Sequence, residues 1–549
     1  MMPAPQGIAV LQDASPSAAM AAAAARSPAS ECLLVPASAS AAYASGPVLL
    51  TYAAMQSRID ALAGSYSAAG LGAGHRVAML LENRPAYFEH WLALNSLTVS
   101  VVPINPDYRR AEIEYLLTHS EAVMAVGVRE RLDDLRAAGA EAIDADEVAY
   151  GLPKISTAAS PSEPGLATEC ALMYTSGTTG QPKGCLLSNE YFLRSGLRYV
   201  NRRGHVHLKP GRSRVLTPLP MFHMNAMAGS TMGMILSGGC VIQLDRFHPK
   251  TWWRDVAQSR ATGIHCLGVM PALLLGLPFT PDESAHCVEY GTAANVEPQH
   301  HEAFEKRFGF PLIEGWAMTE TGSGGAISAD TEPRHIGTRC FGRPPASVEV
   351  RLVDDAGNDV PEGEPGELLV RQAGPDPKRG FFSGYLKDPQ ATAAGWAVGW
   401  WHTGDMVQRW PDGTLHFADR KKNVIRRSGE NISALEVEGV LRDHPLVAEV
   451  AVTGVPDEVR GEEVMACIVA TKSAGAAEAR EIFDVAFERT AYFKCPGWIA
   501  FVPSLPTTAT QKLQRGAVRE LGASLPGTAA CFDLRPFKQR SKSAQKGSA

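Results

Sequence analysis

The sequence predicts a large α/β fold with a bigger amino-terminal domain and a smaller carboxy-terminal domain. From about residue 50 to residue 313, short apolar runs that read as buried strands alternate with segments that read as helices. Such alternation is typical of a largely parallel sheet whose strands are joined by helices. A chain of 549 residues is also far longer than one ordinary domain, so several cores are expected.

The composition excludes several classes of protein. Hydrophobic residues make up 45% and charged residues 20%, as in a globular protein. A net charge of −6, without a long basic cluster, predicts no nucleic-acid partner and no anionic membrane partner. Ten cysteines are scattered singly, which argues against zinc and disulfide scaffolds and favours a reducing cytoplasm. No apolar run reaches membrane-spanning length.

Residues 1–46 are rich in alanine, serine and proline. Within them, Ser15-Pro16 predicts the start of a helix that runs to Arg26, with serine as cap and proline in the first turn. The remainder of this segment is expected to be a loosely held arm.

The segment from residue 47 to residue 420 is expected to form the large domain. Its pattern predicts helices at 52–66, 86–96, 110–118, 227–236, 252–259 and 298–308. It predicts strands at 76–81, 99–102, 122–126, 171–174, 240–244, 264–269 and 287–290, and residues 215–225 are expected to be a strand that runs into a loop carrying His223. Past residue 348, short strands and turns indicate a β-rich subdomain that closes this domain.

Residues 421–549 are expected to form a small, mobile α/β domain. The boundary near residue 420 follows from the charged run that begins at Asp419. The predicted strands lie at 424–426, 447–452 and 464–469, and the predicted helices at 435–442 and 477–490.

The stretch 174–184 follows a strand and carries the residues of a phosphate-binding loop, namely Thr175, Ser176, Gly177, Thr178, Thr179, Gly180 and Lys183. Glycines let backbone N–H groups approach a ligand, hydroxyls add donors for phosphate oxygens, and lysine adds a positive charge. The spacing differs from the common Gly-x4-Gly-Lys-Ser/Thr loop. The alternative is a polar hairpin loop without a ligand.

Four further motifs follow in order: Gly315 to Glu320, Trp401 to Asp405, Asp419-Arg420, and the neighbourhood of Lys512. With the phosphate loop, their order and spacing resemble those of the adenylate-forming enzymes, the superfamily of acyl-CoA synthetases. The resemblance covers residues from about 50 to 520. Within the superfamily the chain resembles the acyl-CoA ligases, and the run 426–432 is similar to crotonobetaine/carnitine–CoA ligases.

This resemblance implies an ATP-dependent acid–CoA ligase. A carboxylate would attack the α-phosphorus of ATP to give an acyl-adenylate and pyrophosphate, and the thiol of CoA would then displace AMP. The implied cofactors are ATP, Mg²⁺ and CoA, and the implied partner is a small carboxylic acid. The first step needs positioning and charge neutralisation more than covalent help from the protein.

The resemblance also implies roles for nucleotide-binding residues. The loop from Thr175 to Lys183 would hold the β- and γ-phosphates, Thr319 would contact the α-phosphate, and Glu320 would help to hold Mg²⁺. Trp316 stands where the family usually has tyrosine and would stack on adenine. The remaining implied contacts are Gly291, Thr292, Ala293, Gly315, Ala317 and Met318 around adenine, and Asp405 and Arg420 on the ribose.

The resemblance places His223 near the reacting carboxylate, without a role as general base. Lys512 would stabilise charge during adenylation, although Gln511 replaces the glycine that commonly precedes it, and glutamine disfavours positive φ. Gly429 would border the path of CoA in the second step. Lys422 would be the hinge that lets one small domain serve both steps.

Each of these residues also has a structural alternative: a surface acid for Glu320, a core tryptophan for Trp316, a turn aspartate for Asp405, a core histidine for His223, and exposed charges for Arg420 and Lys512. The acid pocket would involve His223, Asn225, Met227, Gly291 and Met318, which favours a short or medium and polar acid. An enzyme with another acceptor, a carrier-protein thiol or an amine, and a catalytically silent nucleotide-binding protein stay open. A monomer and a homodimer are both compatible with the sequence.

Overall fold

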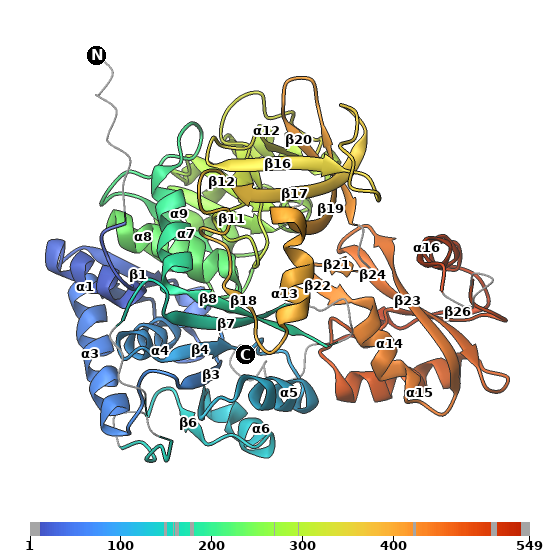
Figure 1. The fold of residues 1–549 in the computed structure, drawn as a ribbon, viewed down its shortest axis with the longest axis horizontal. Coiled ribbons are helices and arrows are strands. Elements are labelled where there is room, and N and C mark those ends of the chain that lie inside the picture. Colours follow the sequence, from blue (N-terminus) through green and yellow to red (C-terminus); the bar gives the residue numbers. More distant parts are fainter. Residues whose placement is uncertain are drawn as a thin grey trace.

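The computed structural model describes residues 11–147, 151–157, 159, 164–175, 181–267, 269–294, 296–420, 424–506 and 513–539. A large amino-terminal unit contains three sheets, and a smaller carboxy-terminal unit contains a fourth (Figure 1). The predicted α/β class, with layered subdomains and a β-rich subdomain, is confirmed. Among the described residues, none of the helices is both long and apolar enough to cross a membrane.

The first sheet of the large unit has the strand order β18-β8-β7-β4-β3-β5-β6. Its strands are β3 (Arg76–Leu80), β4 (Ser100–Pro103), β5 (Met124–Gly127), β6 (Ala142–Asp144), β7 (Glu169–Thr175), β8 (Lys183–Ser188) and β18 (Gly384–Tyr385). Strands β4, β3, β5, β6 and β7 run parallel, whereas β8 and β18 are antiparallel additions. The helices of this region are α3 (Tyr52–Ala68), α4 (Pro85–Ser96), α5 (Arg110–Ser120) and α6 (Leu132–Ala137), with a 3₁₀ turn η1 (Arg129–Arg131).

The second sheet has the order β14-β13-β12-β11-β9-β10-β1-β2, with antiparallel strands only at its two edges. Its strands are β1 (Glu31–Val35), β2 (Val48–Thr51), β9 (Arg214–Thr217), β10 (Cys240–Gln243), β11 (Gly263–Leu267), β12 (Tyr290–Ala294), β13 (Leu312–Trp316) and β14 (Ile327–Ser328). The associated helices are α7 (Asn189–Asn201), the π-helix η3 (Asn225–Thr231), α8 (Met232–Ser237), α9 (Trp252–Gln258), α10 (Val269–Leu275), α11 (Asp282–Ala285) and α12 (Pro298–Phe308). A shared apolar core lies between the first two sheets.

The expectation of a loosely held arm is wrong for the described part of residues 1–46. Helix α1 (Pro16–Arg26) begins as predicted, with the Ser15 side chain accepting from the Ala18 N–H, but it is packed against α3, α4 and α8. Met20 is fully buried, and β1 lies inside the second sheet between β10 and β2, while the short helix α2 (Ala37–Ser40) joins β1 to β2. Alanine lets a helix approach its neighbours closely, so an alanine-rich segment can belong to a core.

The third sheet is antiparallel, with the order β15-β20-β19-β17-β16. Its strands are β15 (Cys340–Gly342), β16 (Val348–Val353), β17 (Pro365–Gln372), β19 (Trp401–Arg409) and β20 (Leu415–Arg420), and it carries α13 (Pro389–Gly395) and η4 (Ala397–Gly399). It is the predicted β-rich subdomain. It is drawn in yellow and orange above the small unit in Figure 1.

The small unit is built on β21 (Val424–Arg427), β22 (Glu430–Ser433), β23 (Val447–Asp457), β24 (Gly461–Ala470), β25 (Trp498–Phe501) and β26 (Cys531–Asp533). Its helices are α14 (Ala434–Arg442), α15 (Ala476–Arg489), α16 (Arg515–Ser524) and the 3₁₀ turn η5 (Arg535–Phe537). Two apolar clusters of its own lie on the two sides of the sheet, one under α14 and α15 and one under α16. Helix α15 lies against α5 of the large unit.

Candidate active site

The predicted phosphate loop connects two antiparallel strands. Thr175 is the last residue of β7 and Lys183 the first of β8, and the register sets them opposite each other. Ser176, Gly177, Thr178, Thr179 and Gly180 lie outside the described residues. The hairpin geometry is compatible with both interpretations of this loop, but it sets the Thr175 hydroxyl and the Lys183 ammonium at its two ends.

Glu320 lies beside the base of this loop and is buried. Its Oε1 accepts a hydrogen bond of 2.8 Å from the Tyr385 hydroxyl and one of 3.4 Å from Thr175 Oγ1. Burial, and then the Glu320 charge, raise the pKa of Tyr385 far above its usual value, so the phenol stays a donor. The interpretation of Glu320 as a surface acid is therefore wrong.

Tyr385 also faces the lysine of the loop. Lys183 Nζ lies 5.1 Å from the centre of the Tyr385 ring and 3.5 Å from Asp388 Oδ2. Strand β18 carries Tyr385 next to β8, where it is paired with Cys185. Tyr385 was not predicted as a site residue, because the two-residue strand β18 shows no periodic pattern.

Thr319 lies in the turn after β13, close to α7. The buried Tyr191 of α7 donates a hydrogen bond of 2.9 Å to the Thr319 carbonyl, which fixes this turn relative to α7. The Thr319 side chain lines the same cavity as Glu320 and Met318.

Trp316 and Asp405 are hydrogen-bonded to each other. The indole Nε1 of Trp316 donates to Asp405 Oδ2 over 2.8 Å, and the Asp405 N–H donates to Thr403 Oγ1 over 3.0 Å. Asp405 is fully buried, and its backbone is in register with Arg420 on β20. A tyrosine at position 316 would lack this N–H donor, so the tryptophan changes how the carboxylate is held.

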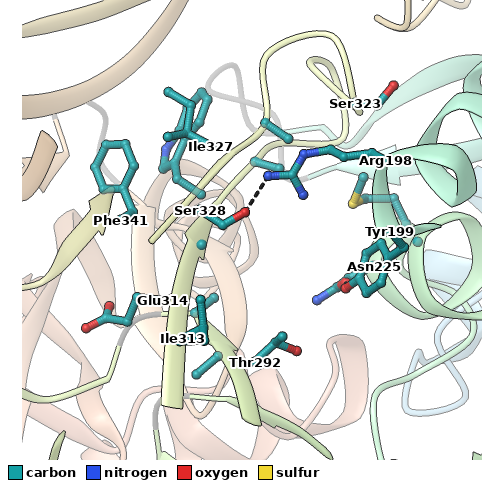
Figure 2. Close-up of a pocket in the computed structure, with 18 of the residues that line it drawn as sticks. Arg198, Tyr199, Asn225, Thr292, Ile313, Glu314, Ser323, Ile327, Ser328 and Phe341 are labelled. Carbon is teal, nitrogen blue, oxygen red and sulfur yellow. Dashed lines mark hydrogen bonds between the residues drawn. The ribbon is translucent and has the colours of Figure 1, made fainter. Parts of the chain in front are cut away.

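A cavity of about 180 Å³ runs along β12 and β13 (Figure 2). Its walls include Thr292 and Ala293 of β12, and Gly315, Trp316 and Ala317 at the end of β13. Gly291 lies instead in the packing between strands, where a Cβ would come within 2.8 Å of the Leu312 side chain. The predicted adenine residues are thus brought together, with two exceptions. Gly291 makes room for Leu312, and Met318 lines the larger cavity together with Thr319 and Glu320.

A larger cavity of about 630 Å³ lies between the two units. The large unit lines it with Thr175, Lys183, His223, Thr319 and Glu320, and the small unit contributes Ser428, Gly429, Glu430 and Lys494. His223 is half-exposed, its Nε2 lies 3.8 Å from Glu430 Oε2, and its ring stands against Phe222. A buried core histidine, the structural alternative for His223, is not what the structure contains.

The turn between β21 and β22 brings the small unit to this cavity. Gly429 has φ of +92°, which side chains other than glycine rarely adopt, and an added Cβ would come within 2.8 Å of Leu267 Cδ1. Glycine is needed here both for the backbone conformation and for the close approach to β11.

Lys494 joins the two units at the edge of the cavity. It donates hydrogen bonds of 2.6 Å to Glu112 of α5 and to Glu436 of α14, and it lies 4.3 Å from the centre of the Tyr108 ring. Burial alone would lower the pKa of Lys494, but the charges of Glu112 and Glu436, together with Tyr108, raise it well above its usual value. Lys494 therefore carries its charge across the working range of pH.

Lys422 and Lys512 lie outside the described residues. Leu505 and Leu513, on either side of the segment 507–512, are packed with α16. In Figure 1, α16 lies at the right-hand edge, on the far side of the small unit from the large unit. The small unit faces the cavity with the β21–β22 turn, with residues 458–461 and with Lys494.

The chain matches known protein families over most of its length. Residues 21–386 match the AMP-binding enzyme family. The chain belongs to this family. Residues 436–512 match the carboxy-terminal domain of AMP-binding enzymes, so the family resemblance extends through most of the small unit.

The relatives of this AMP-binding enzyme include CoA ligases. It is 32% identical over 480 residues to the sulfoacetate–CoA ligase of Cupriavidus necator, covering 85% of this chain and 91% of the relative. It is 29% identical over 488 residues to the crotonobetaine/carnitine–CoA ligase of Citrobacter koseri, covering 84% and 92%. Its fold is similar to that of o-succinylbenzoate CoA synthetase from Bacillus subtilis, with a TM-score of 0.77, 24% identity, and coverage of 91% and 98%.

These matches confirm the predicted resemblance to adenylate-forming enzymes and the predicted class of AMP-forming acid–CoA ligase. They equally support ATP, Mg²⁺ and CoA as its cofactors, and an acid, ATP and CoA as its partners.

Proposed function

We propose that this chain activates a short, polar carboxylic acid with ATP and transfers the acyl group to CoA, using the residues described above. The observation that carries the proposal is the large cavity, because residues of both units line it. Glu320, Thr175 and Lys183 stand on one side and the Gly429 turn on the other. Such a site has room for a nucleotide phosphate region beside a path for a thiol.

In the first half-reaction, a carboxylate oxygen of the acid attacks the α-phosphorus, the α–β phosphate bond breaks, and pyrophosphate leaves. We assign Thr175, Lys183 and the loop between them to the departing phosphates, and Thr319 to the α-phosphate. Asp405 accepts the ribose hydroxyls, Arg420 supports it, and Trp316 contacts adenine. Positioned charges of this kind lower the barrier without forming covalent bonds to the substrate.

Glu320 is the residue we assign to Mg²⁺. A buried carboxylate beside a hydroxyl-rich loop fits a hard cation that shares its oxygen ligands with phosphates. Among the described residues, there is no cluster of three or more His, Cys, Asp or Glu side chains that could hold a metal ion by itself. When bound, Mg²⁺ neutralises charge on the phosphate oxygens.

In the second half-reaction, the CoA sulfur bonds to the acyl carbon, the thiol loses its proton, and AMP leaves with the bonding electron pair. The Gly429 turn lines the path of CoA, and His223 lies where the acyl group and the thiol meet. We assign Lys512 to adenylation. Since its neighbours Leu505 and Leu513 lie beside α16, this role requires the small unit, which we place at residues 421–549, to turn about a hinge at Lys422.

The substrate class is inferred from the part of the smaller cavity that lies beyond its adenine-lining residues. The whole cavity measures about 180 Å³, below the roughly 300–1,000 Å³ of pockets for drug-sized ligands, so little of it remains for the acid. We infer a short acid with a polar end, as in the relatives named for sulfoacetate and for crotonobetaine or carnitine. We further propose a cytoplasmic enzyme that acts as a monomer or a homodimer.

A screen for AMP release tests this function. Purified protein is incubated with ATP, Mg²⁺, CoA and panels of short, hydroxylated, betaine-like, aryl and medium-chain acids. A short polar acid is expected to give AMP, pyrophosphate and an acyl-CoA in equal amounts. Pyrophosphate release without CoA thioester, and with an amine or carrier-protein product, would instead establish a different acceptor, and no turnover with any acid would indicate a silent nucleotide-binding protein.

A further inference from the structure

The smaller cavity continues past the adenine-lining residues toward helix α7. There Arg198 extends from α7 across the cavity toward Ser328 of β14 (Figure 2). None of the roles assigned above uses this arginine. A guanidinium in the wall of this cavity needs a partner, because burying a charge is costly unless something pairs with it.

Arg198 has one hydrogen-bond partner and no ion pair among the described residues. Its guanidinium donates to the neutral hydroxyl of Ser328. Burial, and then the nearby charge of Arg202, lower the pKa of Arg198 to about 10, which still leaves it charged near neutral pH. Four of its five N–H donors thus remain for a ligand.

Three other charged side chains around the cavity take part in ion pairs. The pairs are Arg202 with Asp330, Arg339 with Glu297, and Glu314 with His301. Arg426, which also reaches the cavity wall, lies over the ring of Phe417. The Asp330 carboxylate in particular is engaged by Arg202 through several hydrogen bonds, so it does not pair with Arg198.

Neutral donors complete the same end of the cavity. Tyr199 donates its hydroxyl hydrogen to Asn225 Oδ1 over 3.0 Å, and this bond fixes the orientation of the amide. In Figure 2, the amide nitrogen of Asn225 points into the cavity, on the side that faces Ser328 and Arg198. A positive charge, an amide N–H₂ and a hydroxyl around one small space form a site for an anion.

We propose that Arg198, oriented by Ser328 and assisted by Asn225, binds a second anionic group on the acid, so that the substrate is a short carboxylic acid with a distal carboxylate or sulfonate. The inference rests on the proposed function and makes it specific. One carboxylate reacts with ATP near His223, and the other anionic group occupies the α7 end of the cavity. A bidentate guanidinium suits both planar carboxylates and sulfonates.

The same charge disfavours a betaine. A trimethylammonium group at the α7 end would face an unpaired guanidinium in a partly desolvated cavity, where like charges repel strongly. Crotonobetaine and carnitine are therefore expected to be poor substrates, although the run 426–432 is similar to ligases for those acids.

Matched pairs of acids test the proposal. Each pair has the same length and differs in the distal charge: sulfoacetate with methylsulfonylacetate, malonate with malonamate, and succinate with succinamate. For at least one pair, kcat/KM measured by AMP release is expected to be at least tenfold higher for the anionic member. Equal values for the two members in all three pairs, or a preference for carnitine, would overturn the proposal.

Substitutions in α7 test whether Arg198 causes the preference for the anionic acid. Arg198→Met is expected to lower kcat/KM at least a hundredfold for the anionic acid, mainly through KM, and less than threefold for its neutral partner. Arg198→Lys keeps the charge and should retain part of the preference. The control is Arg194→Met, one turn earlier on α7, because Arg194 pairs with Glu190 and does not line the cavity.

A binding measurement separates this inference from the proposed function. Calorimetry of the anionic acid in the presence of α,β-methylene-ATP and Mg²⁺ needs neither catalysis nor CoA. Loss of acid binding in Arg198→Met, with unchanged affinity for the nucleotide, supports the anion site even if no thioester forms. Equal acid affinity in wild type and Arg198→Met would overturn it, and the unchanged nucleotide affinity shows that the variant is folded.

Discussion

At the scale of single residues, the bond between Trp316 and Asp405 predicts a measurable dependence of ATP binding on the indole N–H. Trp316→Phe keeps an aromatic ring but removes the donor to a fully buried carboxylate. A hydrogen bond to a charged group contributes about 1.5–3 kcal/mol. We expect KM for ATP to rise roughly tenfold, since about 1.4 kcal/mol corresponds to a factor of ten, with a smaller change in kcat.

The matched control is Trp253→Phe. Trp253 is a buried tryptophan of α9 whose indole N–H has no hydrogen-bond partner among the described residues. This variant should leave KM for ATP unchanged. Equal effects of the two substitutions would mean that the Trp316–Asp405 bond does not act on the nucleotide.

Tyr385 leads to a prediction about Mg²⁺. Tyr385→Phe removes the 2.8 Å hydrogen bond to Glu320 Oε1 and leaves this buried carboxylate less firmly oriented. The Mg²⁺ concentration for half-maximal activity is expected to rise roughly three- to tenfold, because loss of a bond that orients a metal ligand commonly costs at least that much. Titration of activity with Mg²⁺ at saturating ATP measures the effect.

Tyr87→Phe serves as the control for this substitution. The hydroxyl of Tyr87 is buried without a hydrogen-bond partner among the described residues, so its removal should not alter the Mg²⁺ requirement. An unchanged Mg²⁺ titration of Tyr385→Phe would show that this tyrosine only fills space beside Lys183.

Motifs predicted the residues that contact nucleotide in relatives, but not the residues that hold them. Thr175, Lys183, Thr319 and Glu320 line one cavity, as the order of the motifs indicated. Tyr385 escaped prediction because β18 has only two residues. Arg198 escaped it because α7 was not among the predicted helices, although Ser188 caps this helix and its buried residues recur at helical spacing. Their partners, Glu320 and Ser328, are far away in sequence and meet them only through sheet and helix packing.

At the scale of elements, the β21–β22 turn predicts a selective loss. Gly429→Ala forces a side chain into a backbone conformation with φ of +92° and into contact with Leu267. We expect thioester formation from a supplied acyl-adenylate to slow by roughly tenfold or more, as a cost of about 1–3 kcal/mol for such strain implies. Single-turnover formation of the acyl-adenylate should change by less than threefold.

Two further variants test whether backbone strain or the contact with Leu267 causes the slower thioester formation. Gly357→Ala places the same strain in the β16–β17 turn, with φ of +83° and no atom within 4 Å, and should affect neither half-reaction. Leu267→Ala combined with Gly429→Ala relieves the steric contact and should restore part of the rate. A uniform loss in both half-reactions for Gly429→Ala would contradict a role in CoA access.

The contact between α12 and β13 predicts a pH dependence of stability. Burial would lower the pKa of His301, but hydrogen bonds to Glu305 and Glu314 and the Glu314 charge raise it to about 9. The folded protein therefore holds this proton more tightly than the unfolded chain, whose histidine pKa is about 6.5. The stabilisation is complete below about pH 6.5 and is lost as pH rises through about 9.

Thermal unfolding measured across this pH range tests whether stability falls as pH rises. The unfolding temperature of the wild type should fall by roughly 2–3 °C between pH 6.5 and 9.5. A rise of the His301 pKa from about 6.5 to about 9 corresponds to about 3 kcal/mol, and an unfolding entropy of about 2.1 cal/mol/K per residue converts this into roughly 3 °C for 549 residues. His301→Gln should flatten this slope, whereas His207→Gln, at an exposed histidine, should reproduce the wild-type slope. A slope in His301→Gln as steep as in the wild type would assign it to other groups.

Most elements could be predicted from periodicity, and the exceptions have physical causes. Helix α12 has the predicted bounds, because proline begins it and Gly309 ends it. Strand β8 was missed since its glycine and lysine weaken the strand pattern, yet it is held by pairing with β7. The predicted strand at 287–290 is displaced to β12 (Tyr290–Ala294), where small residues suit close packing between parallel strands.

At the scale of the whole molecule, Lys494 predicts which arrangement of the two units is favoured. Lys494→Met leaves Glu112 and Glu436 facing each other without a cation, and breaking a buried pair in this way costs about 3–5 kcal/mol. The substitution should therefore disfavour the arrangement in which Gly429 lies at the cavity. We expect slower thioester formation and unchanged or faster acyl-adenylate formation, measured in single turnovers.

Neutralising the carboxylates should reverse the effect. The triple variant Lys494→Met, Glu112→Gln, Glu436→Gln removes all three charges and is expected to regain thioester formation relative to Lys494→Met alone. Lys472→Met, at an exposed lysine of the same unit, is the control. Equal slowing of both half-reactions in Lys494→Met would show that this cluster stabilises the fold without favouring one arrangement.

The buried position of the first helix bears on how the chain folds during synthesis. Leu33 of β1 is paired with Val241 of β10, and α1 is packed against α8. The amino-terminal residues therefore cannot form these contacts until the ribosome has synthesised α8 and β10. At 5–20 residues per second the ribosome needs roughly 10–40 s to supply them. Seven of the eleven residues of α1 are alanine, so this helix exposes few large apolar side chains during that delay. The alanine-rich composition of residues 16–26 therefore limits aggregation before the chain is complete.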